Sequence, residues 1–375
     1  EQRKGNGPLP LQPHPQNQPH PNGEGTTLKP DISLATKTGH FNLLPTPTVE
    51  YSPHMGSSLS KPIVVLLLCM FIQPGGASTS DSPHFRATPQ RLARGKYLAN
   101  LAHCFDCHSE RDAKGNQVAN MRGAGRVLPA EESNIPSPFF LVCPNITPDR
   151  KTGAGLWSDQ QFVRAIREGI GHDGRILHKT MPYWNLRYLT DEDLASIIVF
   201  LRSIPAVYHV LPKRNLAEQP VIDWRPEVQP PPLSSDASAT ARHGEYLVRI
   251  AACTGCHTTA DAQNRPVPGM LFGGGRVFVR PWGTAASANL TRDPSGIGYY
   301  DEAQFIRTIR TGHVGARPLN RTMPYPLYGN LNDEDLKAIF AYLRTLPPVQ
   351  HRVDNTEPPT LCPKDTNRHG FGDRN

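Results

Sequence analysis

The sequence lacks the features that mark several large classes of protein. No apolar run is long enough to cross a bilayer, since the run 63–72 has only ten residues. Strand signals are scarce, and no alternation of strands with helices indicates a parallel α/β sheet. Only 37% of the residues are hydrophobic, while glycine and proline number 31 and 39. We therefore expect small helical cores joined by long loops.

The first 54 residues contain no methionine, and they are rich in Pro, Gln, His, Asn and Gly without a hydrophobic period. Met55 then begins a different pattern, with Lys61, the apolar run 63–72 and small residues at 75–78. This is the layout of a secretory signal peptide over 55–78, with translation starting at Met55 and cleavage near Ala77. Residues 1–54 would then be absent from the mature, exported and periplasmic protein. The alternative is a disordered tail before a short buried helix.

Four of the seven cysteines lie in two copies of one pentapeptide, Cys104-Phe-Asp-Cys107-His108 and Cys253-Thr-Gly-Cys256-His257. This C-x-x-C-H pattern is the attachment signature of c-type haem. Each thiol adds to a vinyl group, and the histidine becomes the proximal ligand of the iron. A redox dithiol would need a βαβ unit, and a zinc site would leave both histidines unexplained. We therefore expect two covalently bound haem c groups, whose porphyrins supply apolar surface to two small cores.

The two motifs lie within a longer duplication. Cys104 and Cys253 are 149 positions apart, and their flanks repeat. The repeated pairs are Gly95-Lys-Tyr97-Leu98 with Gly244-Glu-Tyr246-Leu247, Gly125-Arg126-Val127 with Gly275-Arg276-Val277, Asn145-Ile-Thr147 with Asn289-Leu-Thr291, and Thr180-Met181-Pro182-Tyr183 with Thr322-Met323-Pro324-Tyr325. The predicted fold is all-α, with two tandem cytochrome c-like helical domains over 82–206 and 240–348. Residues 207–239 read as an extended linker and 349–375 as a polar, unpatterned tail.

Helix ends are readable in both copies. The expected N-cap pairs are Ser158 with Gln161, Thr190 with Asp193, Asp301 with Gln304, and Asn332 with Asp335. The last helix of each copy carries an apolar stripe, made of Leu194, Ile197, Ile198 and Leu201 or of Leu336, Ile339, Phe340 and Leu343. Gly95 and Gly244 on the first helices lack a side chain, and we expect the last helix of each copy to cross there.

A histidine-ligated haem iron has one open axial position, and its occupant separates electron transfer from catalysis. Met181 and Met323 lie in matched Thr-Met-Pro-Tyr loops and are the expected sixth ligands, although core packing is the usual role of a methionine. Competing imidazoles have no clear counterparts in the repeat and are expected to be loop residues. These competitors are His172, His178 and His313. Arg126 and Arg276 either pair with haem propionates or are solvated.

At these residues the chain resembles a known family. The segments Asn145-Ile-Thr-Pro-Asp149, Thr180-Met181-Pro182-Tyr183 and Asp191-Glu-Asp193 are similar to the membrane-associated cytochrome c subunits of bacterial alcohol, gluconate and aldehyde dehydrogenase complexes. The resemblance covers about residues 88–347. Family members usually carry three haem domains and are often attached to the membrane near the C-terminus, whereas this chain has two such domains and no apolar segment there.

The resemblance implies two axial ligand pairs, His108 with Met181 and His257 with Met323, and a role in passing electrons from a dehydrogenase towards quinone, a cytochrome or an oxidase. The alternative is a diheme enzyme, such as a peroxidase or thiosulfate dehydrogenase, with one exchangeable haem site; Cys143 keeps a thiolate-ligated variant open. Without residues 1–77 the net charge is 35 − 29 = +6, most of which four propionates offset, so no nucleic-acid partner is expected. Cys143 and Cys362 either form a disulfide in an oxidising compartment or remain two separate thiols.

Overall fold

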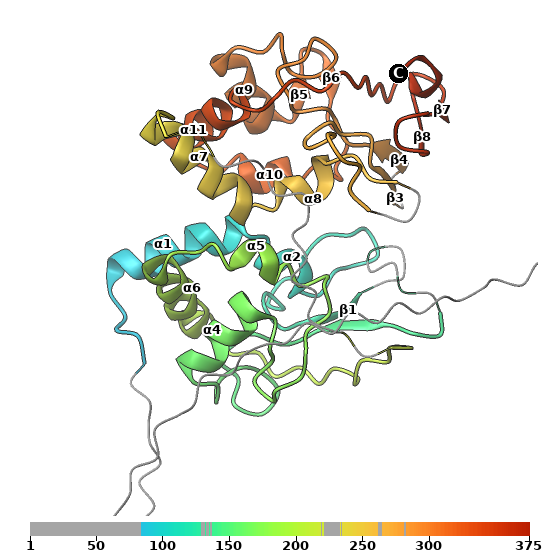
Figure 1. Ribbon diagram of the computed structural model, residues 1–375. Helices are drawn as coiled ribbons and strands as arrows, with labels where there is room; N and C mark the ends of the chain where they lie inside the picture. The colour runs from blue at the N-terminus through green and yellow to red at the C-terminus, as the bar shows by residue number, and fades with distance from the viewer. Residues whose placement is uncertain are drawn as a thin grey trace, which may run out of the picture. The chain divides into compact units, whose positions relative to one another are not determined.

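The computed structural model describes residues 84–128, 132, 135, 137–218, 220, 233, 235–261, 265–280 and 283–375 (Figure 1). The predicted signal peptide and the segment before it lie outside the described residues. Within the described ranges, no helix combines the length and the apolar character that crossing a membrane requires.

Domain 1 contains five helices and one hairpin among its described residues. The helices are α1 (Pro89–Leu101), α2 (Cys104–Cys107), α4 (Asp159–Glu168), α5 (Tyr183–Leu186) and α6 (Asp191–Ser203), and the strands are β1 (Arg126–Leu128) and β2 (Leu141–Cys143). The two strands pair antiparallel, with Val127 opposite Val142.

Domain 2 repeats this order of helices. Its helices are α7 (Ala239–Ile250), α8 (Cys253–His257), α9 (Glu302–Thr311), α10 (Tyr325–Tyr328) and α11 (Asp333–Leu343). In the part of this domain that the structure describes, the strands pair into three antiparallel hairpins, β3 (Val277–Arg280) with β4 (Gly283–Ala286), β5 (His313–Val314) with β6 (Arg317–Pro318), and β7 (Thr360–Leu361) with β8 (Arg368–His369). A 3₁₀ turn, η1 (Gly372–Arg374), ends the chain. The prediction of two tandem, mainly helical domains is confirmed, but the scarcity of strand signals concealed these short hairpins.

The helix ends follow the side-chain caps expected from the sequence. Ser158 and Gln161 form a complete capping box at α4, and Thr190 caps α6 through the backbone amide of Asp193. Asn332 caps α11 through Asp335 in the same way. Each cap satisfies an amide that the first helical turn leaves without an intrahelical partner. The apolar stripes of α6 and α11 are buried throughout, as predicted.

The first and last helices of each domain cross at a glycine. Gly95 of α1 lies against the backbone of α6, where a Cβ atom would come within 1.9 Å of the carbonyl oxygen of Ser196. Gly244 of α7 lies against α11, and a Cβ atom there would come within 1.8 Å of the carbonyl oxygen of Ala338. Figure 1 shows α1 beside α6 and α7 beside α11. The predicted crossing points are confirmed.

The predicted linker begins as a segment bound to domain 1. The carbonyl oxygen of Val207 accepts a hydrogen bond from Asn145 Nδ2 at 2.8 Å. The Nδ1 atom of His209 lies 3.0 Å from the carbonyl oxygen of Ala124. Asn215 pairs with Phe140 through its backbone. Most of the segment between 219 and 234 lies outside the described residues.

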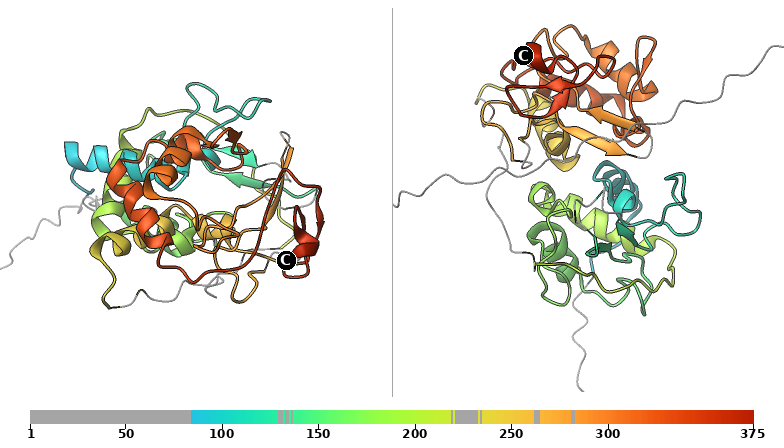
Figure 2. Two further views of the ribbon diagram at one scale, coloured as in Figure 1. Left: turned by 90° about the horizontal axis from the view of Figure 1, so that it is seen from above. Right: turned by 90° about the vertical axis from the view of Figure 1, so that its right-hand side faces the viewer.

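The C-terminal segment 349–375 is polar, as expected, but it is folded against domain 2. Asn355 exchanges two hydrogen bonds with the backbone of Ala286 at the end of β4, at 2.7 and 2.9 Å. Figure 2 shows the segment, in red, beside the β3–β4 hairpin of the same domain. Several of its polar side chains are fully buried, among them His351 and Asp365. The segment is thus folded through contacts between residues far apart in the sequence, which its unpatterned sequence does not predict.

Candidate functional site

Each C-x-x-C-H motif forms one tight helical turn. His103 and Ala252, the residues before the first cysteines, have left-handed backbone conformations with φ of 56° and 54°. This shared bend turns the chain from the first helix of the domain into α2 or α8. Cys104 and Cys107 therefore project from a single turn, as the attachment of one porphyrin through two thioethers requires. Cys253 and Cys256 are arranged in the same way.

The histidine of each motif is held by a backbone carbonyl. His108 Nδ1 lies 2.8 Å from the carbonyl oxygen of Pro144, and His257 Nδ1 lies 2.8 Å from that of Ala288. A carbonyl only accepts, so Nδ1 carries the proton in both rings and the Nε2 lone pair is free to bind a metal. Burial lowers the pKa of both histidines, which keeps the rings neutral. Pro144 and Ala288 occupy matched positions of the repeat.

The methionine loops are also built alike. The amide of Met181 donates to the carbonyl of His178 at 3.0 Å, and that of Met323 donates to Asn320 at 3.0 Å. The carbonyls of both methionines accept from the tyrosine two residues later, at 2.8 Å. Both methionine side chains are partly buried against the hydrophobic core. The structure therefore places the two predicted sixth ligands in equivalent surroundings.

His178, the competing histidine in the first methionine loop, accepts a hydrogen bond from the backbone of the same loop. His178 Nδ1 lies 3.2 Å from the amide of Thr180, which can only donate, so Nδ1 is the accepting nitrogen. Asn320 Oδ1 accepts from the amide of Thr322 at 2.9 Å in the second domain. His178 and Asn320 therefore close the same turn, and in the neutral His178 ring Nε2 carries the proton and cannot bind a metal.

The other two histidines are engaged elsewhere. His172 stacks on Trp157, with ring centroids 4.5 Å apart. His313 is exposed, and its Nδ1 lies 2.9 Å from the carbonyl of Thr311.

Each of the two arginines donates a hydrogen bond to a backbone carbonyl of the haem motif in its own domain. Arg126 is 5% exposed and donates to the carbonyl of Asp106 at 3.1 Å. Arg276 donates to the carbonyl of Gly255, the repeat counterpart of Asp106. Arg126 also forms an ion pair with Glu132, so its charge has an anionic partner and the side chain is not solvated. This shared bond to the residue before the second cysteine was not predicted, because it joins residues about 20 positions apart.

The cysteines of the first motif differ in their surroundings. Burial raises the pKa of the Cys104 thiol to about 12, and it does the same for Cys253. Cys143 of β2 donates a hydrogen bond to Cys107, which lowers the pKa of Cys107 and raises that of Cys143. Cys143 and Cys362 are both free cysteines, so the disulfide considered from the sequence is not formed.

Asn145 and Asn289, which follow the carbonyl partners of the motif histidines, have a structural role that was not predicted from the sequence. Asn145 Oδ1 accepts from the amide and the hydroxyl of Thr147, and its Nδ2 reaches Val207. Asn289 Oδ1 accepts from Thr291 in the same way, while its Nδ2 reaches Val349 at 2.7 Å. Each asparagine thereby ties the loop beside the proximal histidine to the segment that leaves the last helix.

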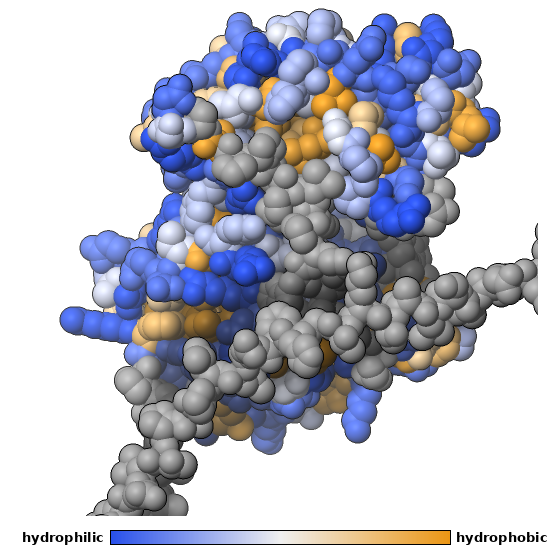
Figure 3. Space-filling model, in the orientation of Figure 1, coloured by the Kyte–Doolittle hydropathy of each residue, from blue (hydrophilic) through white to orange (hydrophobic). Residues whose placement is uncertain are grey.

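The residues present fit a haem group. Two neutral imidazoles present free Nε2 atoms, and Arg126 Nε and Trp184 Nε1 are buried donors without a hydrogen-bond partner among the described residues. Haem propionates are suitable acceptors for such donors. Hydrophobic residues gather in one region of the domain 2 face drawn in Figure 3, surrounded by hydrophilic ones. Partly buried apolar side chains such as Leu271 and Leu290 also line the core of that domain.

Comparison with known proteins gives the family of each half. Residues 92–205 match the family described as cytochrome c, and residues 239–343 match cytochrome C oxidase, cbb3-type, subunit III. The chain is 30% identical over 273 residues to the fructose dehydrogenase cytochrome subunit of Gluconobacter japonicus, covering 68% of this chain and 52% of that protein. It is 27% identical over 281 residues to the gluconate 2-dehydrogenase cytochrome c subunit of Pantoea cypripedii, covering 70% of this chain and 60% of that protein. The chain thus spans little more than half the length of these relatives.

A shorter relative is matched over most of its length. The diheme cytochrome c-type protein of Cereibacter sphaeroides is 24% identical over 279 residues, which cover 72% of this chain and 91% of that protein. With the repeated C-x-x-C-H turns and their matched histidine partners, these similarities show that residues 92–205 and 239–343 form two tandem cytochrome c domains, and that the chain is distantly similar to cytochrome c subunits of dehydrogenases and to a diheme cytochrome c.

Proposed function

We propose that this chain is an exported, periplasmic diheme cytochrome c that relays electrons from a dehydrogenase to the respiratory chain. The observation that supports this most strongly is the equivalence of the two sites. In both domains the motif histidine donates Nδ1–H to a matched carbonyl, and the same methionine loop is built. An enzyme with one exchangeable haem would need the two sites to differ.

The chain's own residues have distinct tasks in this proposal. Cys104 and Cys107 would hold the first haem covalently, and Cys253 and Cys256 the second. His108 and His257 would bind iron through Nε2, each oriented by its carbonyl partner. Met181 and Met323 would each supply a second protein ligand to the iron of their own domain, which would keep water and substrates from binding it. When bound, each haem supplies an iron that accepts and releases one electron.

The electron donor is inferred from the relatives. Two of them are named as cytochrome subunits of fructose and gluconate dehydrogenases. We propose a dehydrogenase of this general kind as the donor, and a quinone, a cytochrome or an oxidase as the acceptor. The protein would set haem burial and docking, while the oxidation of substrate would take place on the partner.

The proposal is tested on the haem-loaded protein purified from the periplasm. Haem content should be two per chain, and the dithionite-reduced protein should not bind carbon monoxide rapidly at either haem. Rapid binding at one haem would instead support the diheme enzyme. Adding a sugar or alcohol substrate to a membrane fraction that contains the proposed donor should reduce both haems, and a heat-inactivated fraction serves as the control. Failure of every such fraction to reduce the haems would overturn the proposed partner class.

A further inference from the structure

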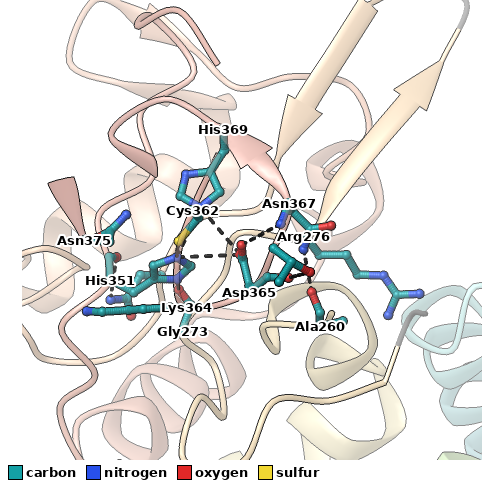
Figure 4. Close-up of polar contacts among 12 residues, drawn as sticks. Ala260, Gly273, Arg276, His351, Cys362, Lys364, Asp365, Asn367, His369 and Asn375 are labelled. Atoms are coloured by element: carbon teal, nitrogen blue, oxygen red, sulfur yellow. Dashed lines mark hydrogen bonds and ion pairs between the residues drawn. The ribbon is translucent and has the colours of Figure 1, made fainter. Parts of the chain in front are cut away.

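Four polar side chains of the C-terminal segment meet inside domain 2. They are His351, Cys362, Asp365 and His369, with exposed fractions of 0%, 0%, 1% and 2%. One ligand atom from each lies within 4.8 Å of all the others. Figure 4 shows the four side chains pointing towards a common centre. Fully buried groups of this kind are normally paired or bind a metal ion, because burial without a partner is costly.

Four of the six separations between these atoms are close to the edges of a tetrahedral metal site. His351 Nε2 lies 3.2 Å from His369 Nε2 and 3.6 Å from Cys362 Sγ. Asp365 Oδ2 lies 3.7 Å from His351 Nε2 and 3.5 Å from His369 Nε2. Zinc bonds of about 2.0–2.3 Å arranged tetrahedrally put their ligand atoms about 3.3–3.7 Å apart.

The hydrogen bonds of the two imidazoles leave both Nε2 atoms available to bind a cation. His351 Nδ1 lies 2.8 Å from the carbonyl of Gly273, and His369 Nδ1 lies 2.9 Å from that of Gly370. Both Nδ1 atoms must therefore donate, and in their neutral form the two rings direct Nε2 lone pairs at each other. Two acceptors in contact repel unless a positive charge lies between them.

The carboxylate adds an independent sign of a missing partner. Asp365 Oδ1 accepts from the amide of Asn367 at 2.9 Å. Asp365 Oδ2 is buried and has no hydrogen-bond partner in the described part of the chain, although it faces both Nε2 atoms. Together, this carboxylate oxygen, the two imidazoles and the thiol are ligand types that zinc prefers.

We propose that His351, Cys362, Asp365 and His369 form a closed structural zinc site that fastens the C-terminal segment to domain 2. The ligands are His351 Nε2, Cys362 Sγ, Asp365 Oδ2 and His369 Nε2, with the Cys362 thiol losing its proton on binding. The carbonyls of Gly273 and Gly370 fix the ring tautomers. This zinc site is inferred independently of the proposed electron transfer.

The site lies against the loop that follows the second haem motif. A Cβ atom at Gly275 would come within 2.4 Å of His351 Cε1 and 2.6 Å of Asp365 Oδ2, so this loop packs directly on the cluster. The amide of Gly274 donates to the carbonyl of His257 at 2.7 Å. Zinc binding would therefore hold the loop that supports the proximal histidine of domain 2.

The repeat supplies a matched control residue. His209 of domain 1 occupies the position of His351, since its Nδ1 lies 3.0 Å from the carbonyl of Ala124 and its amide donates to Thr152 Oγ1 at 3.0 Å. The amide of His351 donates to Ser295 Oγ at 2.9 Å in the corresponding way. The other three ligands come from residues 362–369, beyond the end of the repeat.

The full haem-loaded chain is purified with a tag that does not bind metals, and its metals are measured by mass spectrometry. We expect about one zinc for every two irons, and X-ray absorption at the zinc edge should show one sulfur and three nitrogen or oxygen neighbours. Cys362→Ser and Asp365→Asn should each lower the zinc content strongly while the iron content stays unchanged. His209→Ala should keep its zinc.

The unmodified protein provides a test that does not depend on variants folding. Removal of zinc by a chelator should lower the unfolding temperature, and addition of zinc should restore it. Absence of zinc after incubation with zinc, a zinc spectrum without sulfur, copper in place of zinc, or unchanged zinc in Cys362→Ser would each overturn the proposal.

Discussion

Gly95 lies so close to Ser196 that a methyl group added to the glycine would come within 1.9 Å of the serine's carbonyl oxygen. Gly244 repeats this relationship with Ala338. Because the obstructing atom is backbone, no change of rotamer can relieve the clash, and the two helices would have to separate. The close crossing brings together the first and last helices of each domain, on which the haem motif and the methionine loop depend.

Gly244→Ala should therefore destabilise the protein by about 1–3 kcal/mol or more, the usual cost of overpacking a core. Gly255→Ala is the matched control in the same domain, because nothing lies within 4 Å of an added Cβ at Gly255. Asp106 already occupies the corresponding position in domain 1. Denaturant unfolding of the haem-loaded variants checks this. Equal stabilities for the two variants would show that the helices do not cross as described.

Local signals account for the parts of the fold that the sequence predicted. The cap of Thr190 on Asp193 spans three residues, and the apolar stripe of α6 has the period of a helix, so both can be read from neighbouring residues. The role of Gly95 was also predictable, because its repeat counterpart is a glycine on an otherwise helical segment.

Contacts between distant residues account for what the sequence did not predict. The carbonyl that orients His108 belongs to a residue 36 positions away, and no residue type marks a carbonyl partner. The hydrogen bond from Arg126 to the carbonyl of Asp106 joins residues 20 positions apart. In the C-terminal segment, the spacing from Cys362 through Asp365 to His369 was a possible metal signal, but its fourth member, His351, lies 11 residues before Cys362.

The charge of Arg126 should influence the first haem. Arg126 is almost fully buried, so its positive charge, although paired with Glu132, is little screened by solvent and would disfavour additional positive charge on the oxidised iron of the first haem. Arg126→Gln should lower the reduction potential of that haem by an amount on the order of 1 kcal/mol. Arg126→Lys keeps the charge and should keep most of the potential while losing the forked bonds. Redox titration measures both variants, and a fall of equal size in both would assign the effect to hydrogen bonding instead of charge.

The turn at Asp149 should give a pH-dependent contribution to stability. The backbone amide of Thr152 donates to the Asp149 carboxylate at 2.6 Å and lowers its pKa. The folded-state pKa is thus below the unfolded value of about 3.9, so the contribution is complete above that value and is lost as the pH falls through the folded pKa. Asp149→Asn should reduce the unfolding temperature at pH 7, and the difference from the unmodified protein should shrink as the pH falls below about 4. A difference that stays constant with pH would contradict this assignment.

Replacement of the methionines gives the most direct information on the proposed axial ligands. Met181→Ala should leave the first haem attached, because Cys104 and Cys107 are unchanged. It should lower the potential of that haem and open it to carbon monoxide, because a thioether ligand favours ferrous iron. Axial ligand identity contributes to a spread of roughly 0.8 V among haem proteins, so the change should be well above the error of a redox titration. Met323→Ala should affect the second haem alone in the same way.

His178→Ala is the control for the first haem, because His178 Nδ1 accepts from the amide of Thr180 and its Nε2 carries the proton. The variant loses a turn contact, so we expect a small loss of stability, about 0.5–1.5 kcal/mol, with the spectrum and the potential preserved. Visible absorption and redox titration of Met181→Ala and His178→Ala, measured side by side, separate the two assignments. If the potential and spectrum change in His178→Ala but not in Met181→Ala, the sixth ligand of the first haem is an imidazole, and the equivalence of the two sites no longer supports a relay with two His/Met haems.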